Sequence, residues 1–176
     1  DGHMDAIRIT EAGRELQRFT DDLSNWYVRR CRERYWGKEM TADKEAAYMT
    51  LYTVLKSLCL ISAPFIPFMT EEIYQNIVRS VDTTAPDSIH LCDWPAVDES
   101  YIDKDLEAHM DEVLSVVVLG RSARNTAAIK NRQPIPAMHV QGEELPAMFT
   151  SIISEELNVK LVEYVSDASS FISYRV

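Results

Sequence analysis

Residues 24–36 read Ser24-Asn25-Trp26-Tyr27-Val28-Arg29-Arg30-Cys31-Arg32-Glu33-Arg34-Tyr35-Trp36 and combine four arginines with large aromatic residues. Before this stretch and into it, apolar residues recur at steps of three and four, and they are Ala12, Leu16, Phe19, Leu23 and Tyr27. This spacing predicts a helix with one buried face, capped at Thr10 and ended by Gly37. The charged and aromatic stretch therefore lies at the carboxyl end of an amphipathic helix.

The helical phase of this stretch separates its residues into two faces. Leu23, Tyr27 and Cys31 continue the buried stripe. The opposite face carries Asn25, Arg29, Arg32 and Trp36, with Arg30 and Arg34 in a neighbouring row. An amide can read a base edge, guanidinium groups pair with phosphate, and aromatic rings stack on unpaired bases. The alternative is a solvated basic face, and Trp26 is either a stacking residue or a tryptophan at the edge of the core.

The rest of the chain predicts further helices followed by a small mixed segment. A second helix is expected after a cap at Asp43, and a break packed by two phenylalanines at residues 63–68. A third helix is capped by Thr70, residues 80–100 form an irregular connection, and a fourth helix spans about 103–131. Residues 137–141, 159–165 and 171–176 are strand-like, and residues 145–157 are helix-like. The expected fold is mainly α, a helical bundle with a small α/β C-terminal appendage.

A second group of cations lies in the fourth helix and after it. Arg121, Arg124, Lys130 and Arg132 occur in a segment that contains no acidic residue. They either bind phosphate or complement the negative end of the helix dipole. Both interpretations stay open on the sequence.

Composition limits the function classes. The chain has 176 residues and a net charge of −10, which argues against nonspecific coating of nucleic acid but leaves room for a local basic site. No run approaches the roughly 20 apolar residues of a membrane span. Cys31, Cys59 and Cys92 lack metal-ligand spacing and fit a reducing, cytoplasmic compartment. No catalytic motif, metal site or cofactor motif is found, so no catalytic residue is expected in this chain.

Several motifs resemble the anticodon-binding region of isoleucyl-tRNA synthetases, in the order in which that family has them. They include Asp22-Leu23-Ser24-Asn25-Trp26-Tyr27-Val28-Arg29-Arg30 with Arg32, Arg34 and Trp36, Ala63-Pro64-Phe65-Ile66-Pro67-Phe68, Gly120-Arg121-Ser122-Ala123-Arg124-Asn125, and Ile129-Lys130-Asn131-Arg132-Gln133-Pro134. The resemblance covers nearly the whole chain after residues 1–4, which look like a cloning remnant. It implies an anticodon-binding helical domain at residues 5–133 and the start of a junction domain at 134–176.

The resemblance also implies a function that this chain performs as part of a longer protein. The family recognises the anticodon stem-loop of isoleucine tRNA, and separate upstream domains catalyse isoleucine attachment with ATP and magnesium and edit errors. The family motif has a lysine where Thr126 stands and an apolar residue where Asn131 stands. An upstream helix of the family is missing, which predicts a partly exposed apolar groove along Leu16 and Phe19, filled by the displaced N-terminus or by a neighbouring molecule. The alternatives are a helical protein-interaction or scaffold module, or the same domain of a valyl or leucyl enzyme.

Overall fold

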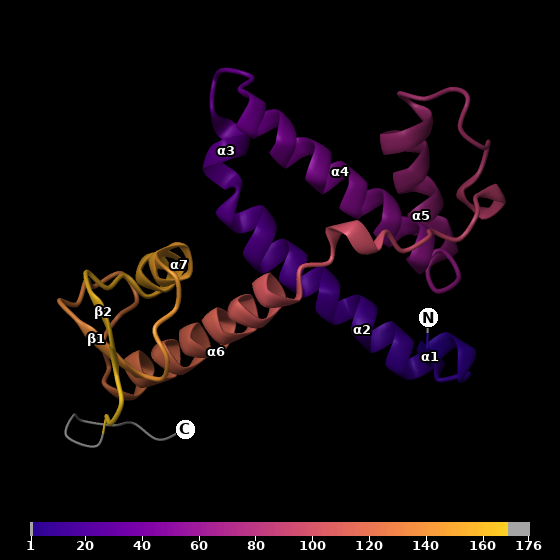
Figure 1. Cartoon of the computed structure of the whole chain (residues 1–176). Helices are drawn as coiled ribbons and strands as arrows, with labels where there is room; N and C mark the ends of the chain where they lie inside the picture. Colours follow the sequence, from indigo (N-terminus) through magenta and orange to yellow (C-terminus); the bar gives the residue numbers. More distant parts are fainter. Residues whose placement is uncertain (1, 169–176) are drawn as a thin grey trace. The chain divides into compact units, whose positions relative to one another are not determined.

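The structure is a computed structural model that describes residues 2–168. The chain divides into two compact units, Asp1–Val97 and Asp98–Val176. Helices make up most of the first unit, and the described part of the second unit combines two helices and a 3-10 turn with a two-stranded parallel sheet (Figure 1). The predicted fold class, mainly α with a small α/β appendage, is confirmed. The strand predicted at residues 171–176 lies outside the described residues.

The first unit begins with a long helical run that changes its geometry along its length. Its parts are α1 (Gly2–Asp5), α2 (Ile9–Asp22), the π-helical segment η1 (Leu23–Val28) and α3 (Arg32–Trp36). The predicted cap at Thr10 is wrong, because α2 begins at Ile9 after Arg8 and no side chain caps it. No residue of α2 is buried, and Phe19 is 48% exposed. The apolar face predicted along Leu16 and Phe19 is therefore partly exposed, since Leu16 is partly buried and Phe19 is exposed.

The other helices of the first unit enclose its core. Thr41 caps α4 (Ala42–Ser62) by accepting a hydrogen bond from the Lys44 N–H, so the predicted cap at Asp43 is wrong. The helix α5 (Pro67–Tyr74) packs against α4 and begins at a proline, whose fixed φ suits the first helical position. The core between them contains Cys59, Ala63, Tyr74, Val78 and Ile89.

Two details of α5 correct the sequence analysis. Thr70 lies inside the helix, where its hydroxyl donates to backbone carbonyls of Ile66 and Pro67 rather than capping the first turn. Phe68 is 91% exposed, so only one of the two phenylalanines at the predicted break is partly covered. Pro67 begins the helix one turn earlier than the sequence suggested.

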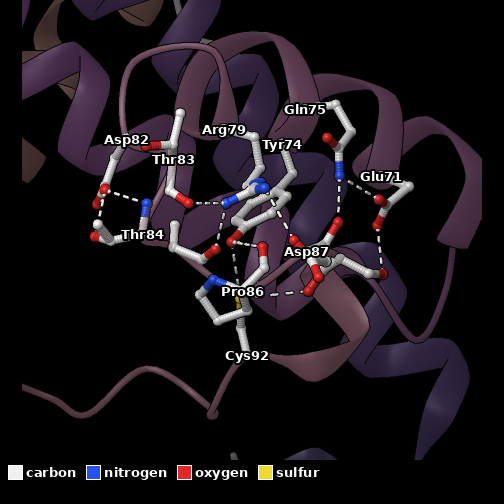
Figure 2. A network of polar contacts seen from close by, with 12 residues as sticks. Glu71, Tyr74, Gln75, Arg79, Asp82, Thr83, Thr84, Pro86, Asp87 and Cys92 are labelled. Atoms are coloured by element: carbon white, nitrogen blue, oxygen red, sulfur yellow. Dashed lines mark hydrogen bonds and ion pairs between the residues drawn. The ribbon is translucent and has the colours of Figure 1, made fainter.

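Polar side chains of α5 and the π-helical segment η2 (Gln75–Arg79) hold the irregular connection that follows (Figure 2). The Glu71 carboxylate accepts hydrogen bonds from Gln75 Nε2 at 2.7 Å, the Ser88 hydroxyl at 2.8 Å and the Ile89 N–H at 2.9 Å. The Gln75 side chain and these other donors lower the pKa of Glu71. This carboxylate fixes the start of the 3-10 turn η3 (Ile89–Leu91).

A second part of the same network lies deeper. Tyr74 donates its hydroxyl proton to the Pro86 carbonyl at 2.8 Å, and burial raises the pKa of Tyr74 to about 12. Arg79 pairs with Asp87 at 2.9 Å and also donates to the carbonyls of Thr83 and Ala85 (Figure 2). The connection between the helices is thus ordered by hydrogen bonds, although it has little regular secondary structure.

The second unit contains a long helix and a βαβ element. After the short turn η4 (Glu99–Tyr101), Asp103 caps α6 (Lys104–Thr126) by accepting from the Leu106 N–H at 2.9 Å. The helix ends at Thr126, five residues before the predicted end, because Ala128 adopts a left-handed conformation with φ 55°. The Ile129 N–H then bonds to the Arg124 carbonyl and the Ala128 N–H to the Asn125 carbonyl, the pattern of a Schellman cap.

The two strands of the sheet pair each residue with the one 24 positions further along the chain. The strand β1 (Met138–Gln141) runs parallel to β2 (Val162–Val165), with Met138 opposite Val162, and α7 (Ala147–Leu157) connects them. The helix α7 packs on α6, where Leu157 lies so close to Gly120 that a Cβ there would be 2.3 Å from Leu157 Cδ1. This crossover places the end of α7 beside the chain that follows α6.

Candidate nucleic-acid interface

The four side chains of the predicted outward row are all exposed. Trp36 is 75% exposed, and the Arg32 guanidinium lies 5.3 Å from the centre of its ring. Arg29 lies 5.8 Å from the Trp26 ring, and its Nε donates to the Asn25 carbonyl at 2.7 Å. The row therefore presents cation–aromatic pairs and an amide to solvent.

The predicted inward face is covered by α4. Cys31 is buried, Leu23 and Tyr27 are partly buried, and the Tyr27 hydroxyl donates to the Ala47 carbonyl at 3.3 Å. Trp26 and Arg30 are also partly buried, so each lies at the border between the two faces. The contact with α4 fixes the direction of the outward row.

The turn between α3 and α4 is tied together by Arg34. Its Nε and Nη2 bond to the two carboxylate oxygens of Asp43 at 2.8 and 2.7 Å, and Nη2 also donates to the Asp43 carbonyl at 2.9 Å. The Asp43 side chain raises the pKa of Arg34 further. Nearby, Tyr35 and Tyr48 have ring centres 5.0 Å apart, and burial raises the pKa of Tyr35. Arg34 is thus held by Asp43 across the turn, whereas Arg32 and Trp36 lie against each other on the exposed row.

The second cationic group divides into buried and exposed members. Arg121 forms an ion pair with Glu156 at 2.7 Å, and Arg124 is only 4% exposed. Arg124 Nη2 donates to the carbonyls of Asn131 and Gln133. Lys130 and Arg132 are exposed on the segment that Arg124 contacts. The structure thus brings all four cations to one region of the second unit, where Arg124 is buried, Arg121 is partly exposed and paired with Glu156, and Lys130 and Arg132 are exposed.

Sequence reasoning missed the acceptors and donors that engage these cations. The side chain of Glu156 is buried against Arg121, 35 residues away in the sequence. Asn158, with φ 50°, donates from Nδ2 to the Arg132 carbonyl at 3.0 Å. An asparagine just after a helix is a signal for a left-handed cap, but its contact with a segment 26 residues away has no local signal.

The same region contains a pocket of about 550 Å³. Most of its lining is apolar and comes from α6, β1 and the end of α7, and Arg124 is part of the wall. Within residues 2–168, no three His, Cys, Asp or Glu side chains form a group that could hold a metal ion. No helix in the described part of the chain is long and apolar enough to span a membrane.

A family model described as the anticodon-binding domain of tRNA ligase matches residues 1–139. The chain belongs to this family. The match includes residues 1–4, and α1 covers Gly2–Asp5, where the sequence analysis expected a cloning remnant. The anticodon-binding family model also extends through the start of β1.

Individual relatives of this anticodon-binding domain are isoleucine–tRNA ligases. The chain is 51% identical over 176 residues, its whole length, to the protein of Clostridium kluyveri, and 53% identical over 174 residues to that of Clostridium acetobutylicum. It is 43% identical over 179 aligned residues, 98% of the chain, to the protein of Thermus thermophilus. The chain spans 17% of the length of each of these relatives.

Proposed function

We propose that this anticodon-binding domain recognises the anticodon stem-loop of isoleucine tRNA as part of an isoleucine–tRNA ligase. A catalytic domain elsewhere in the longer polypeptide attaches isoleucine in the cytoplasm, and we assign ATP and magnesium to that domain and the editing of errors to a separate one. The relatives named isoleucine–tRNA ligase support this choice over the valyl and leucyl enzymes. We propose that the anticodon-binding domain comprises residues 5–133 and that residues 134–176 start the junction domain.

One observation carries the proposal: the exposed Arg32–Trp36 pair in the outward row. An indole that is 75% exposed and covered on one side by a guanidinium is a stacking surface for an unpaired base. The neighbouring guanidinium groups supply charge for phosphate oxygens on either side of that base. An apolar partner protein would gain little from a surface in which every aromatic ring lies beside a cation.

The geometry also suggests roles within the row. We assign base stacking to Trp36 and base-edge contact to the Asn25 amide, with Arg29 and Arg32 as phosphate contacts. Trp26 and Arg30 lie at the border of this surface and complete it. Arg34 does not contact RNA in this assignment but fixes the end of the row by binding Asp43 of α4.

The proposal is tested by binding of the full chain to isoleucine tRNA and to the same tRNA with a changed anticodon. Trp36→Ala should weaken binding to the isoleucine tRNA about 5- to 150-fold, the range for loss of one stacked base. Arg32→Ala should also reduce the slope of log affinity against log salt by about 0.7 to 0.9. Arg18→Ala is the matched control, since Arg18 is an exposed cation outside the row.

Equal affinity for the two tRNAs would refute recognition of the anticodon. Loss of affinity in Arg18→Ala as large as in Arg32→Ala would show that only general charge matters. Binding of neither tRNA at low salt would instead favour the protein-interaction module.

A further inference from the structure

We propose that Arg124 and Asn158 are positioning residues that hold residues 129–133 as a preformed loop, in which Lys130 and Arg132 bind RNA phosphate. The inference rests on the proposed tRNA function and adds a second contact to it, in the unit formed by residues 98–176. Of the four cations, Lys130 and Arg132 are then exposed ligands, Arg124 is an internal support, and Arg121 is paired with Glu156.

Arg124 is placed to shape the loop rather than to touch RNA. Its side chain is 96% buried, since only 4% is exposed, and Nη2 reaches the carbonyls of Asn131 and Gln133. Its Nε and Nη1 have no hydrogen-bond partner in the described part of the chain. A guanidinium enclosed in this way cannot reach a phosphate at the surface, but it fixes the backbone on both sides of Arg132.

Asn158 binds the Arg132 carbonyl, which Arg124 does not bind. Its Nδ2 donates to the Arg132 carbonyl at 3.0 Å, between the two carbonyls bound by Arg124. Three successive carbonyls are therefore bound by side chains from α6 and from the end of α7. Lys130 and Arg132 lie on this fixed segment with exposed side chains.

Both ends of the loop are also anchored. At its start, the Ile129 N–H bonds to the Arg124 carbonyl at 2.9 Å in the cap of α6. At its end, Ile135 donates to the Asn158 carbonyl at 3.2 Å and accepts from the Lys160 N–H at 3.0 Å. A loop already fixed in this way loses little conformational entropy when it binds a ligand.

The charge balance of the loop favours an anion. Arg121 is neutralised by Glu156, whereas Arg124, Lys130 and Arg132 make no ion pair with a carboxylate in residues 2–168. Three positive charges thus gather in a protein whose net charge is −10. Local cations of this kind attract phosphate over the short range that salt leaves unscreened.

The loop is tested with inorganic tripolyphosphate by NMR titration of the full chain. We expect amide shifts concentrated in residues 129–133, larger than those around the exposed Arg14 and Arg18, and lost in the Lys130→Ala/Arg132→Ala double variant. Asn158→Gly should weaken binding about 3- to 10-fold, since glycine keeps the left-handed backbone and removes only the side-chain bond. Ala128→Gly, which changes the neighbouring cap without touching the loop carbonyls, is the control and should bind normally.

Coupling between the variants separates positioning from general stability. In the Arg132→Ala variant, which keeps Lys130 and therefore part of the binding, Asn158→Gly should have a smaller effect than in the wild type, and both variants should keep the cooperative unfolding of the wild type. An equal loss of affinity from Asn158→Gly in the two backgrounds would refute positioning. A titration without shifts at 129–133 would refute the phosphate site, whatever the result of the tRNA binding assay. If the tripolyphosphate titration gives the expected shifts but the tRNA assay shows no preference for the isoleucine anticodon, the proposed function is refuted and the phosphate site at residues 129–133 is still supported.

Discussion

Breaking the Arg34–Asp43 pair tests whether Arg34 supports the outward row or contacts RNA itself. The guanidinium makes two parallel bonds to the carboxylate, at 2.8 and 2.7 Å, and one to the Asp43 carbonyl at 2.9 Å. Asp43 also lies in the first turn of α4, where a negative charge complements the helix dipole. The pair joins α3 to α4 at the turn that fixes the position of Trp36.

The contribution of the Arg34–Asp43 pair to stability follows from its geometry and from the exposure of the two side chains. Exposed ion pairs contribute about 0.2–1 kcal/mol. Arg34 and Asp43 have 36% and 69% of their side-chain surfaces exposed, so solvent screens them strongly. The bidentate geometry and the additional carbonyl bond place this pair at the upper end of that range, at about 1 kcal/mol.

A double-mutant cycle with Arg34→Ala and Asp43→Ala, followed by urea unfolding, measures this energy. The coupling should be about 0.5–1 kcal/mol at low salt and should decrease at about 1 M salt. Arg34→Ala should change tRNA affinity about twofold or less, far below the effect of Arg32→Ala. A coupling of zero, combined with a loss of affinity equal to that of Arg32→Ala, would refute the supporting role.

Three further variants test other contacts. Glu71→Gln should destabilise the chain by about 1–2 kcal/mol at neutral pH, because its carboxylate accepts three hydrogen bonds. Since the folded pKa is lowered, this stability is present above the unfolded pKa of about 4.3 and disappears as pH falls through the folded value, a dependence that Glu71→Gln should remove in urea unfolding. Ala128→Gly should stabilise the chain by about 0.5–1 kcal/mol in the same assay, because φ is 55° there. Gly120→Ala should reduce the free energy of unfolding by about 1–3 kcal/mol through overpacking against Leu157, and should therefore lower the thermal midpoint.

Each of these variants has an outcome that would contradict its reason. An acid-induced loss of stability that is identical in Glu71→Gln and wild type would show that other carboxylates cause it. A destabilised Ala128→Gly would mean that the left-handed cap is not formed. A raised midpoint in Gly120→Ala would show that helix propensity outweighs the contact with Leu157.

Much of the fold could be predicted from the sequence, because apolar periodicity reports directly which faces are buried. It identified the buried position of Cys31 and the βαβ pattern after Pro134. The helix ends were less predictable. Thr10, Asp43 and Thr70 all have cap chemistry, but Thr41 and Pro67 supply the geometry that is used.

The candidate site could be predicted only in outline. Sequence spacing indicates which cations share a helix face, but it does not show where their acceptors are. The oxygen acceptors of Arg34, Arg121 and Arg124 lie 7 to 35 residues away and come from other elements or loops. The side chains of Arg34, Arg121 and Arg124 are therefore engaged by distant parts of the chain, and this depends on tertiary packing that local patterns do not encode.

The π-helical segment η1 constrains how the length of this chain can change during evolution. Adding or removing one residue within Leu23–Val28 would rotate everything after it by about 100° about the helix axis. Arg32 and Trp36 would then turn toward α4, and Cys31 would turn to solvent. We therefore expect relatives that use this surface to vary their side chains between Leu23 and Gly37 but to keep the number of residues constant, an expectation that aligned lengths can test without any binding measurement.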